Sequence, residues 1–125
     1  MTPTGDVREE RLLPKWERAS LGKIVRIISR KTLQRAWVRY RDTENPLKAW
    51  FKEAEAANWT SPDDVRRQYR TASVVGNERV VFNIKGNSYK LVVALNYAAK
   101  TVFIKSFGTH AEYDRIDVTE VQHDD

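Results

Sequence analysis

The stretch that decides the fold occupies residues 79–114 and reads RVVFNIKGNSYKLVVALNYAAKTVFIKSFGTHAEYD. It contains three runs of apolar and β-branched residues that alternate with polar ones, which is the pattern of half-buried strands. Turn signals at residues 85–87 and 97–100 separate these runs, so we expect the chain to reverse direction twice. The sequence therefore predicts three consecutive antiparallel strands, at residues 80–84, 89–96 and 101–107.

Alternation assigns the side chains of each strand to two faces. One face is mostly apolar and suited to be covered by helices; it carries Val80, Phe82, Ile84, Tyr89, Leu91, Val93, Leu95, Val102, Ile104 and Ser106. The opposite face mixes the cationic and amide residues Arg79, Asn83, Lys85, Lys90 and Lys105 with apolar ones that include Phe103 and Phe107. A half-solvated antiparallel sheet has this pattern by default, so the basic face alone does not establish a binding surface.

Upstream of these strands the sequence predicts one more strand and three helices. A β-branched run at residues 24–28 indicates a strand, and residues 30–41 have apolar side chains at helical spacing. A second helix is expected to start with Asn45 as N-cap and Pro46 as its first helical residue. A short third helix is expected to start with Ser61 as N-cap and Asp64 at the capping-box position, and to run through residue 69. The aromatic residues Trp37, Trp50, Phe51 and Trp59 are expected in the core.

This order of elements predicts an α+β fold. A β-strand, two to three helices and a β-meander form a sandwich when the helices pack on one face of the sheet.

Composition limits the class of protein further. A chain of 125 residues is one domain with a substantial core. It contains no cysteine, so disulfides and thiolate chemistry are excluded, and this composition fits the reducing cytoplasm in which we expect the protein. Its longest apolar runs have the length of strands and are too short for a membrane-spanning helix.

The charge is unevenly distributed along the chain, although the formal net charge is only +5. Residues 65–105 carry eight bases and the single acid Glu78, whereas residues 110–125 carry six acids and the single base Arg115. A basic body predicts an anionic partner, nucleic acid above all. The alternative, that lysine and arginine merely keep a small domain soluble, stays open at this point.

A histidine and a tyrosine follow the last predicted strand directly, in the segment GTHAEYD at residues 108–114. If the segment is helical, His110, Tyr113 and Asp114 share one side. A strand end beside a cationic face is a common place for functional groups. Taken singly, a histidine here is more often a capping or packing residue, and a tyrosine a half-buried packing residue.

Metal and phosphate-loop enzymes are disfavoured. His110 and His123 are the only histidines, and the carboxylates near the end of the chain lack a recognisable ligand spacing. No glycine-rich phosphate loop occurs. We therefore expect neither a metal site nor a cofactor.

The sequence of residues 79–114 resembles that of the HigB-type toxins of bacterial toxin–antitoxin pairs, which are a branch of the RelE-like ribonucleases that cut messenger RNA. The resemblance runs from about Val25 to about Val121 and rests on NIKGNSYKLVVALNY and FIKSFGTHAEYDRID, with THAEYD its most specific part. It covers Asn83, Gly86, Asn87, Tyr89, Lys90, Gly108, His110, Tyr113 and Asp114. Lys90 stands where arginine is expected at least as often, and lysine lacks the bidentate fork of arginine.

The resemblance implies a RelE-like fold and an endoribonuclease that needs no metal and acts on messenger RNA at the ribosome. It also implies a cognate helix-turn-helix antitoxin, contact with DNA only through the antitoxin complex, and no membrane partner. In such cleavage the ribose 2′-OH attacks the adjacent phosphate, so a base, an acid and cations are required. The expected catalytic residues are His110, Tyr113, Lys90 and Lys105, and the expected RNA-binding residues are Arg79, Asn83, Lys85 and Asn87. A non-catalytic RNA- or protein-binding module on the same fold is the alternative.

Residues 1–23 have neither a helical nor a strand period and lack the apolar core of a secretory signal. Related chains commonly open with methionine at the position of Val25, and the valine codon GUG also initiates translation in bacteria. We therefore predict that residues 1–23 are an extension, disordered or added by gene annotation, and that residues 24–125 form a single RelE-like toxin domain. The alternative is a genuine N-terminal arm anchored by Leu12, Leu13 and Trp16.

Overall fold

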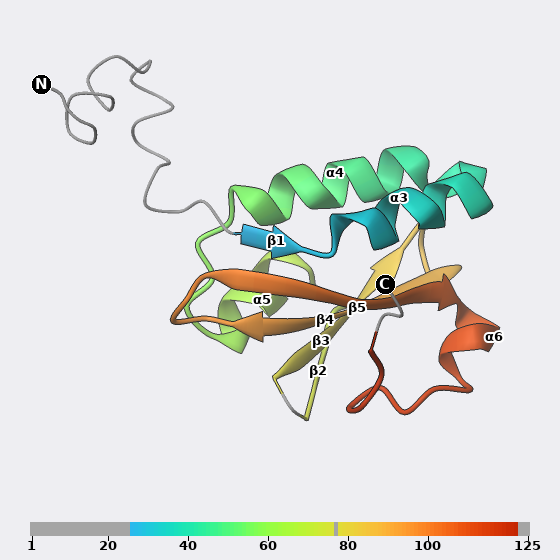
Figure 1. The fold of residues 1–125 in the computed structure, drawn as a ribbon. Helices are drawn as coiled ribbons and strands as arrows, with labels where there is room; N and C mark the ends of the chain where they lie inside the picture. The colour runs from blue at the N-terminus through green and yellow to red at the C-terminus, as the bar shows by residue number, and fades with distance from the viewer. Residues whose placement is uncertain (1–25, 77, 123–125) are drawn as a thin grey trace, which may run out of the picture.

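The computed structural model describes residues 26–76 and 78–122, which form a five-stranded sheet with helices layered on one face (Figure 1). The predicted extension and the first two residues of the predicted N-terminal strand lie outside these described residues. Within the described part of the chain, no helix has the length and apolar character needed to cross a membrane.

The sheet has the strand order β1-β5-β4-β3-β2. An antiparallel meander consists of β2 (Ser73–Val75), β3 (Arg79–Ile84), β4 (Tyr89–Asn96) and β5 (Thr101–Thr109). The strand β1 (Arg26–Ile28) pairs with β5 in parallel and forms the other edge. The three strands predicted from residues 80–107 are confirmed, and the three-residue edge strand β2 is additional.

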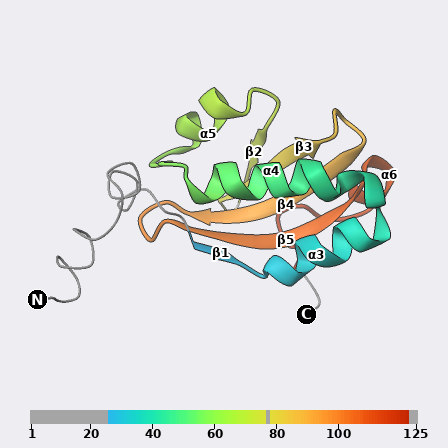
Figure 2. The ribbon, with the colours of Figure 1, turned by 90° about the horizontal axis from the view of Figure 1, so that it is seen from above.

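Three helices cover one face of the sheet, as the sequence predicts. They are α3 (Arg30–Arg39), α4 (Glu44–Glu55) and the shorter α5 (Pro62–Gln68), and the 3-10 turn η2 (Arg41–Thr43) joins the first two. Figure 2 shows α3 and α4 side by side above the strands. A fourth helix, α6 (His110–Tyr113), follows β5 at the end of the sheet.

Two predicted helix starts differ from the structure in detail. The N-cap of α4 is Thr43, so the prediction of Asn45 is wrong; the Thr43 hydroxyl donates to the Tyr40 carbonyl at 2.6 Å and closes the preceding turn. Pro46 is the third residue of α4 and not the first as predicted, because the helix begins at Glu44. Its missing N–H still has no helical partner to lose there. The third helix begins after Ser61 as predicted, but Asp64 accepts from the backbone and hydroxyl of Thr60, and Ser61 makes no side-chain cap.

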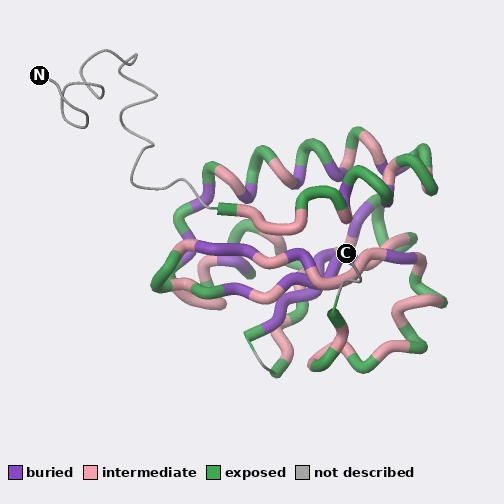
Figure 3. Tube along the Cα trace, in the orientation of Figure 1, coloured by how far each residue is buried: buried purple, intermediate pink, exposed green. Residues whose placement is uncertain are grey.

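The core lies between the helices and the sheet (Figure 3). Its centre is Phe82 of β3, whose ring lies 5.4 Å from that of Trp50, 6.0 Å from that of Trp59 and 5.0 Å from that of Tyr69. Trp50 and Trp59 are buried as expected, whereas Trp37 and Phe51 are only partly buried at its margin.

A β-bulge in β5 changes which residues face the helices. Val92 pairs with Ser106 while Val93 pairs with Ile104, so Lys105 has no partner in the ladder. The extra residue returns Phe107 to the helix side, opposite Leu91. Its ring stacks on Tyr89 at 5.5 Å. The assignment of Phe107 to the basic face, and of Ser106 to the apolar face, is therefore wrong.

The chain after α6 returns across the face of the sheet opposite the helices, here called the open face (Figure 1). The guanidinium of Arg79 donates to the carbonyls of Val118, at 3.2 Å, and Val121. Lys105 donates to the side chain of Gln122 at 2.8 Å. Arg79 is consequently only 5% exposed, and the returning segment covers its part of the open face.

We predict that Arg79→Ala loosens this returning segment while the core stays intact. The substitution removes both hydrogen bonds to the segment and should cost about 1–3 kcal/mol of stability. Amide hydrogen exchange should accelerate at residues 117–122 and stay unchanged in β4. Arg70→Ala, at an exposed arginine, is the control, and unchanged exchange at 117–122 in Arg79→Ala would contradict the role of Arg79.

Candidate functional site

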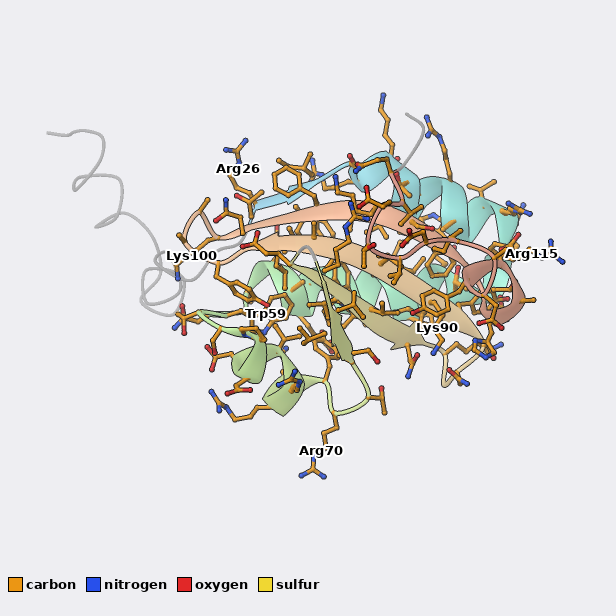
Figure 4. The ribbon with its side chains drawn as sticks, turned by 90° about the horizontal axis from the view of Figure 1, so that it is seen from below. Arg26, Trp59, Arg70, Lys90, Lys100 and Arg115 are labelled. Carbon is orange, nitrogen blue, oxygen red and sulfur yellow. The ribbon has the colours of Figure 1, made fainter. Side chains whose placement is uncertain are left out.

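Three residues of the predicted site meet on the open face, at the end of the sheet next to α6. Lys90 of β4 pairs with Asn83 of β3 in the ladder, and its ammonium donates to the Asn83 side-chain oxygen at 2.6 Å. The same ammonium lies 5.7 Å from the centre of the Tyr113 ring. Figure 4 shows Lys90 at the same end of the sheet as Arg115, opposite the end with Arg26 and Lys100.

His110 begins α6 and is exposed. Its backbone N–H donates to the carbonyl of Ser88 at 3.1 Å, which holds the helix against the β3–β4 turn that carries Asn87. The imidazole itself has no hydrogen-bond or ion-pair partner among residues 26–76 and 78–122. The structure thus places His110 and Asn87 at the same edge of the site, with the imidazole free to meet a ligand.

A small cavity opens beside Lys90 and Tyr113. Its volume is about 120 Å³, and its lining includes the cations Arg39 and Lys90, the hydroxyl of Ser106 and the phenol of Tyr113. Two cations and two hydroxyl groups around so small a space suit an anionic group such as a phosphate. The carboxylate of Glu112 also lines it.

Glu112 fixes the position of α6, and sequence reasoning assigned it no role. Its carboxylate accepts hydrogen bonds from the backbone N–H of Thr109, at 2.8 Å, and from the Tyr40 hydroxyl, also at 2.8 Å. It also pairs with Arg39 at 3.1 Å. The Thr109 side chain accepts in turn from the Glu112 N–H, which completes a capping box. The pattern Thr-x-x-Glu was visible in the sequence and could have identified this helix start.

These bonds lower the pKa of Glu112. The backbone N–H of Thr109 contributes most, followed by the Tyr40 hydroxyl, and both favour the charged carboxylate. The carboxylate therefore stays ionised and bonded to α3 and to the start of α6.

Gly108 makes room for this carboxylate. A Cβ at residue 108 would lie 2.6 Å from Glu112 Oε1, which is closer than a Cβ atom approaches, and 3.1 Å from the Glu112 Cβ, which is a tight contact. The backbone conformation of Gly108 is one that other residues also adopt, so it does not require glycine. The close approach of Glu112 is what requires it.

The other predicted site residues are not in contact with the Lys90 cluster. Lys85 lies in the β3–β4 turn with a φ of 55° and pairs with Asp42 at 2.6 Å. The positive φ interrupts the strand alternation, so the Lys85 side chain reaches Asp42 in the helical layer. The hydrogen bond from its ammonium lowers the pKa of Asp42. Arg79 is buried under the returning segment. Lys105 lies beside it, and burial together with the charge of Arg79 lowers the Lys105 pKa.

Potential metal ligands are scattered in the part of the chain that the structure describes, where no group of three or more histidine, cysteine and acidic residues could hold an ion. His123 lies outside that part.

Two comparisons with known proteins give matches over most of the described domain. The profile of the HigB toxin family, described as the RelE-like toxic component of a toxin–antitoxin system, matches residues 43–116. The chain is also similar to the mRNA interferase HigB of Escherichia coli O6:H1, with 22% identity over 92 residues, which cover 72% of this chain and 89% of that protein. The family match contains Lys90, His110 and Tyr113 together with Glu112.

We predict that Gly108→Ala destabilises the protein by about 1–3 kcal/mol, because the added methyl group meets the Glu112 carboxylate. Gly76→Ala is the matched control, since a Cβ there meets only a Thr119 methyl group at 3.6 Å. Urea unfolding measures both variants. Combining Gly108→Ala with Glu112→Ala should cost less than the sum of the single changes. Equal stabilities of the two glycine variants would refute the close-approach argument.

A second prediction concerns pH. The pKa of Glu112 is lower in the folded protein than its ordinary value of 4.5, so this group stabilises the fold above that pH. The contribution is lost as the pH falls through the lowered folded-state pKa. The difference in unfolding free energy between wild type and Glu112→Gln should therefore be largest near pH 7 and shrink below about pH 4.5. A difference that stays constant between pH 7 and pH 3 would contradict an ionised, bonded carboxylate.

Proposed function

The chain belongs to the HigB family, the RelE-like toxic component of a toxin–antitoxin system, and from this premise we propose that it is an endoribonuclease that cleaves messenger RNA without a metal ion. The name of its Escherichia coli relative, an mRNA interferase, supports the substrate. The observation that carries the proposal is that Lys90 and Tyr113 line a small cavity. Asn83 accepts a hydrogen bond from the Lys90 ammonium, and His110 begins the helix that carries Tyr113.

In the proposed reaction, side chains of the protein supply the acid, the base and the cation that are required. The 2′-oxygen of a ribose attacks the adjacent phosphorus, and the bond from phosphorus to the 5′-oxygen of the next nucleotide breaks. The products are a 2′,3′-cyclic phosphate and a free 5′-hydroxyl. One proton leaves the 2′-hydroxyl and one must reach the departing oxygen, so an acid and a base are needed.

His110 is the group proposed for proton transfer: it takes the proton of the 2′-hydroxyl as general base and then gives a proton to the departing 5′-oxygen as general acid. Lys90 stabilises the negative charge on the phosphorane, and Asn83 holds its ammonium in place at 2.6 Å. Tyr113 supplies a hydrogen bond or a ring on which a base stacks. Asn87, in the adjacent turn, is proposed to contact the RNA.

The remaining predicted site residues receive lesser roles. Lys105 and Lys85 are proposed to attract the RNA backbone from the margin of the site. Arg79 contributes by holding the returning segment, because its guanidinium is buried there.

The domain, the cellular location and the partner of the protein are part of the same proposal. Residues 24–125 act as a single toxin domain, and residues 1–23 are not needed for it. Cleavage occurs in the cytoplasm, during translation on the ribosome. A helix-turn-helix antitoxin neutralises the protein and connects it to DNA.

A non-catalytic RNA- or protein-binding module is the second candidate. It is favoured by the imidazole of His110, which lacks an orienting partner among the residues that the structure describes, whereas catalytic bases are commonly held by a third group. The two candidates differ in whether message is cut.

We predict that wild-type protein cuts a translated message and that His110→Ala lowers the cleavage rate by a factor of about 100 or more. Stability and RNA affinity should stay at wild-type levels in this variant. His123→Ala, at the other histidine, should cleave as fast as wild type. Primer extension on a message in a reconstituted translation system measures the cuts, with ribosome-free RNA as the comparison.

Each alternative outcome has a definite meaning. Full cleavage by folded His110→Ala would remove His110 from the mechanism. RNA binding by wild type with no cuts, with or without ribosomes, would favour the binding module. Lys90→Gln should reduce both cleavage and affinity, because the cation contacts the phosphate in either case.

A further inference from the structure

A groove lies between α3 and α4, and none of its lining residues belongs to the cavity beside Lys90 and Tyr113. The volume of the groove is about 570 Å³. Leu33 lies at its base, and the partly buried rings of Trp37 and Phe51 line it. Aromatic rings left at the surface between two helices are suited to receive apolar side chains of a partner.

The rim of this groove is cationic. Arg30, Lys31, Lys48 and Lys52 line it, and none of its lining residues is acidic. Arg30 lies over the Phe51 ring at 5.7 Å, and Lys48 lies over the Trp37 ring at 5.4 Å. Of the four, only Lys48 forms an ion pair among the described residues, with Glu44. The groove therefore combines an apolar floor with an unbalanced positive charge.

A second hollow continues this surface over α3. It shares Lys31 and Gln34 with the groove and reaches Val38 and Arg39. Val38 is 66% exposed and is the one large hydrophobic residue that stands exposed in the described part of the chain. Together these residues make a continuous surface, here called the α3–α4 surface.

We infer that the α3–α4 surface binds an acidic amphipathic helix of the antitoxin. Charge complementarity selects the occupant: a helix with Asp and Glu beside apolar residues at spacings of three and four would seat its apolar side chains on Trp37, Phe51 and Val38. Its carboxylates would face the cationic rim. An RNA strand fits the charge and could stack bases on the rings, but the exposed Val38 has no stacking face and favours an apolar side chain of a protein partner.

The size of the surface agrees with this occupant. The ten residues of α3 span about 15 Å, which accommodates two to three turns of a partner helix. The α3–α4 surface also extends to the candidate site, because Arg39 lines both the second hollow and the cavity beside Lys90. The inference rests on membership of a toxin–antitoxin family and does not depend on RNA cleavage.

Charge reversal tests the surface. Lys31→Glu combined with Lys52→Glu should weaken binding of the antitoxin encoded with this protein by about tenfold or more, measured by calorimetry with the purified proteins. Val38→Ser should weaken it by about fivefold. Arg26→Glu combined with Arg70→Glu, at exposed positions away from the groove, is the matched control and should bind within about twofold of wild type. Circular dichroism and thermal unfolding establish that each variant folds.

The readouts separate this inference from the proposed function. Antitoxin binding is measured directly, so it decides the matter even if the protein cuts no RNA. Cleavage by the groove variants should equal that of wild type. Unchanged antitoxin affinity in the folded groove variants overturns the inference. It is also overturned if they lose RNA affinity alone, or if they only abolish self-association of the wild-type chain.

Photo-crosslinking identifies the segment that occupies the surface. A benzophenone amino acid replacing Val38 should crosslink to the antitoxin, and mass spectrometry of the product should map the link to a helical segment with more acidic than basic residues. The same group at Arg70 should give no crosslink. A link to a segment with an excess of Lys and Arg would overturn the proposed charge match.

Discussion

The Glu112 carboxylate joins the helical layer to the end of the sheet, and the geometry of the candidate site depends on it. It connects Tyr40 and Arg39, at the end of α3, with Thr109, at the start of α6. A four-residue helix is too short to be stable alone, so its position comes from these contacts. Because α6 carries both His110 and Tyr113, their positions relative to Lys90 depend on this carboxylate and on the missing side chain of Gly108, together with the backbone hydrogen bond from His110 to Ser88.

The main strands and helices could be predicted because their periods are clear, whereas local irregularities could not. Nothing in the residues at 101–107 indicates the bulge at Lys105, since each of them tolerates either face of the sheet; packing of Phe107 on Tyr89 selects the shifted register. The edge strand β2 was absent from the prediction because three residues are too few to show alternation. Residues 43–46 contain two possible caps, Thr43 and Asn45, and the contact with Tyr40 decides between them.

The site could be predicted where strand alternation holds. Asn83 and Lys90 face the same side and meet, as their positions in the strands suggest. Alternation fails for Lys85, because a positive φ turns the chain at that residue, and its charge pairs with Asp42 instead. Arg79 has the expected face, but the burial of its guanidinium depends on the path of residues 114–122. That path is set by long-range contacts that have no local pattern in the sequence.

Both edge strands of the sheet are shorter than the strands beside them. β1 and β2 each have three residues in the described structure and pair only with residues 101–103 of β5 and 79–81 of β3. Beyond these pairs, residues 104–109 of β5 and 82–84 of β3 have no strand partner on their outer side within the described part of the chain. The longest stretch of backbone without an outer strand partner is therefore on β5, and strand addition by an extended peptide or a neighbouring copy would use it in preference to either three-residue edge strand.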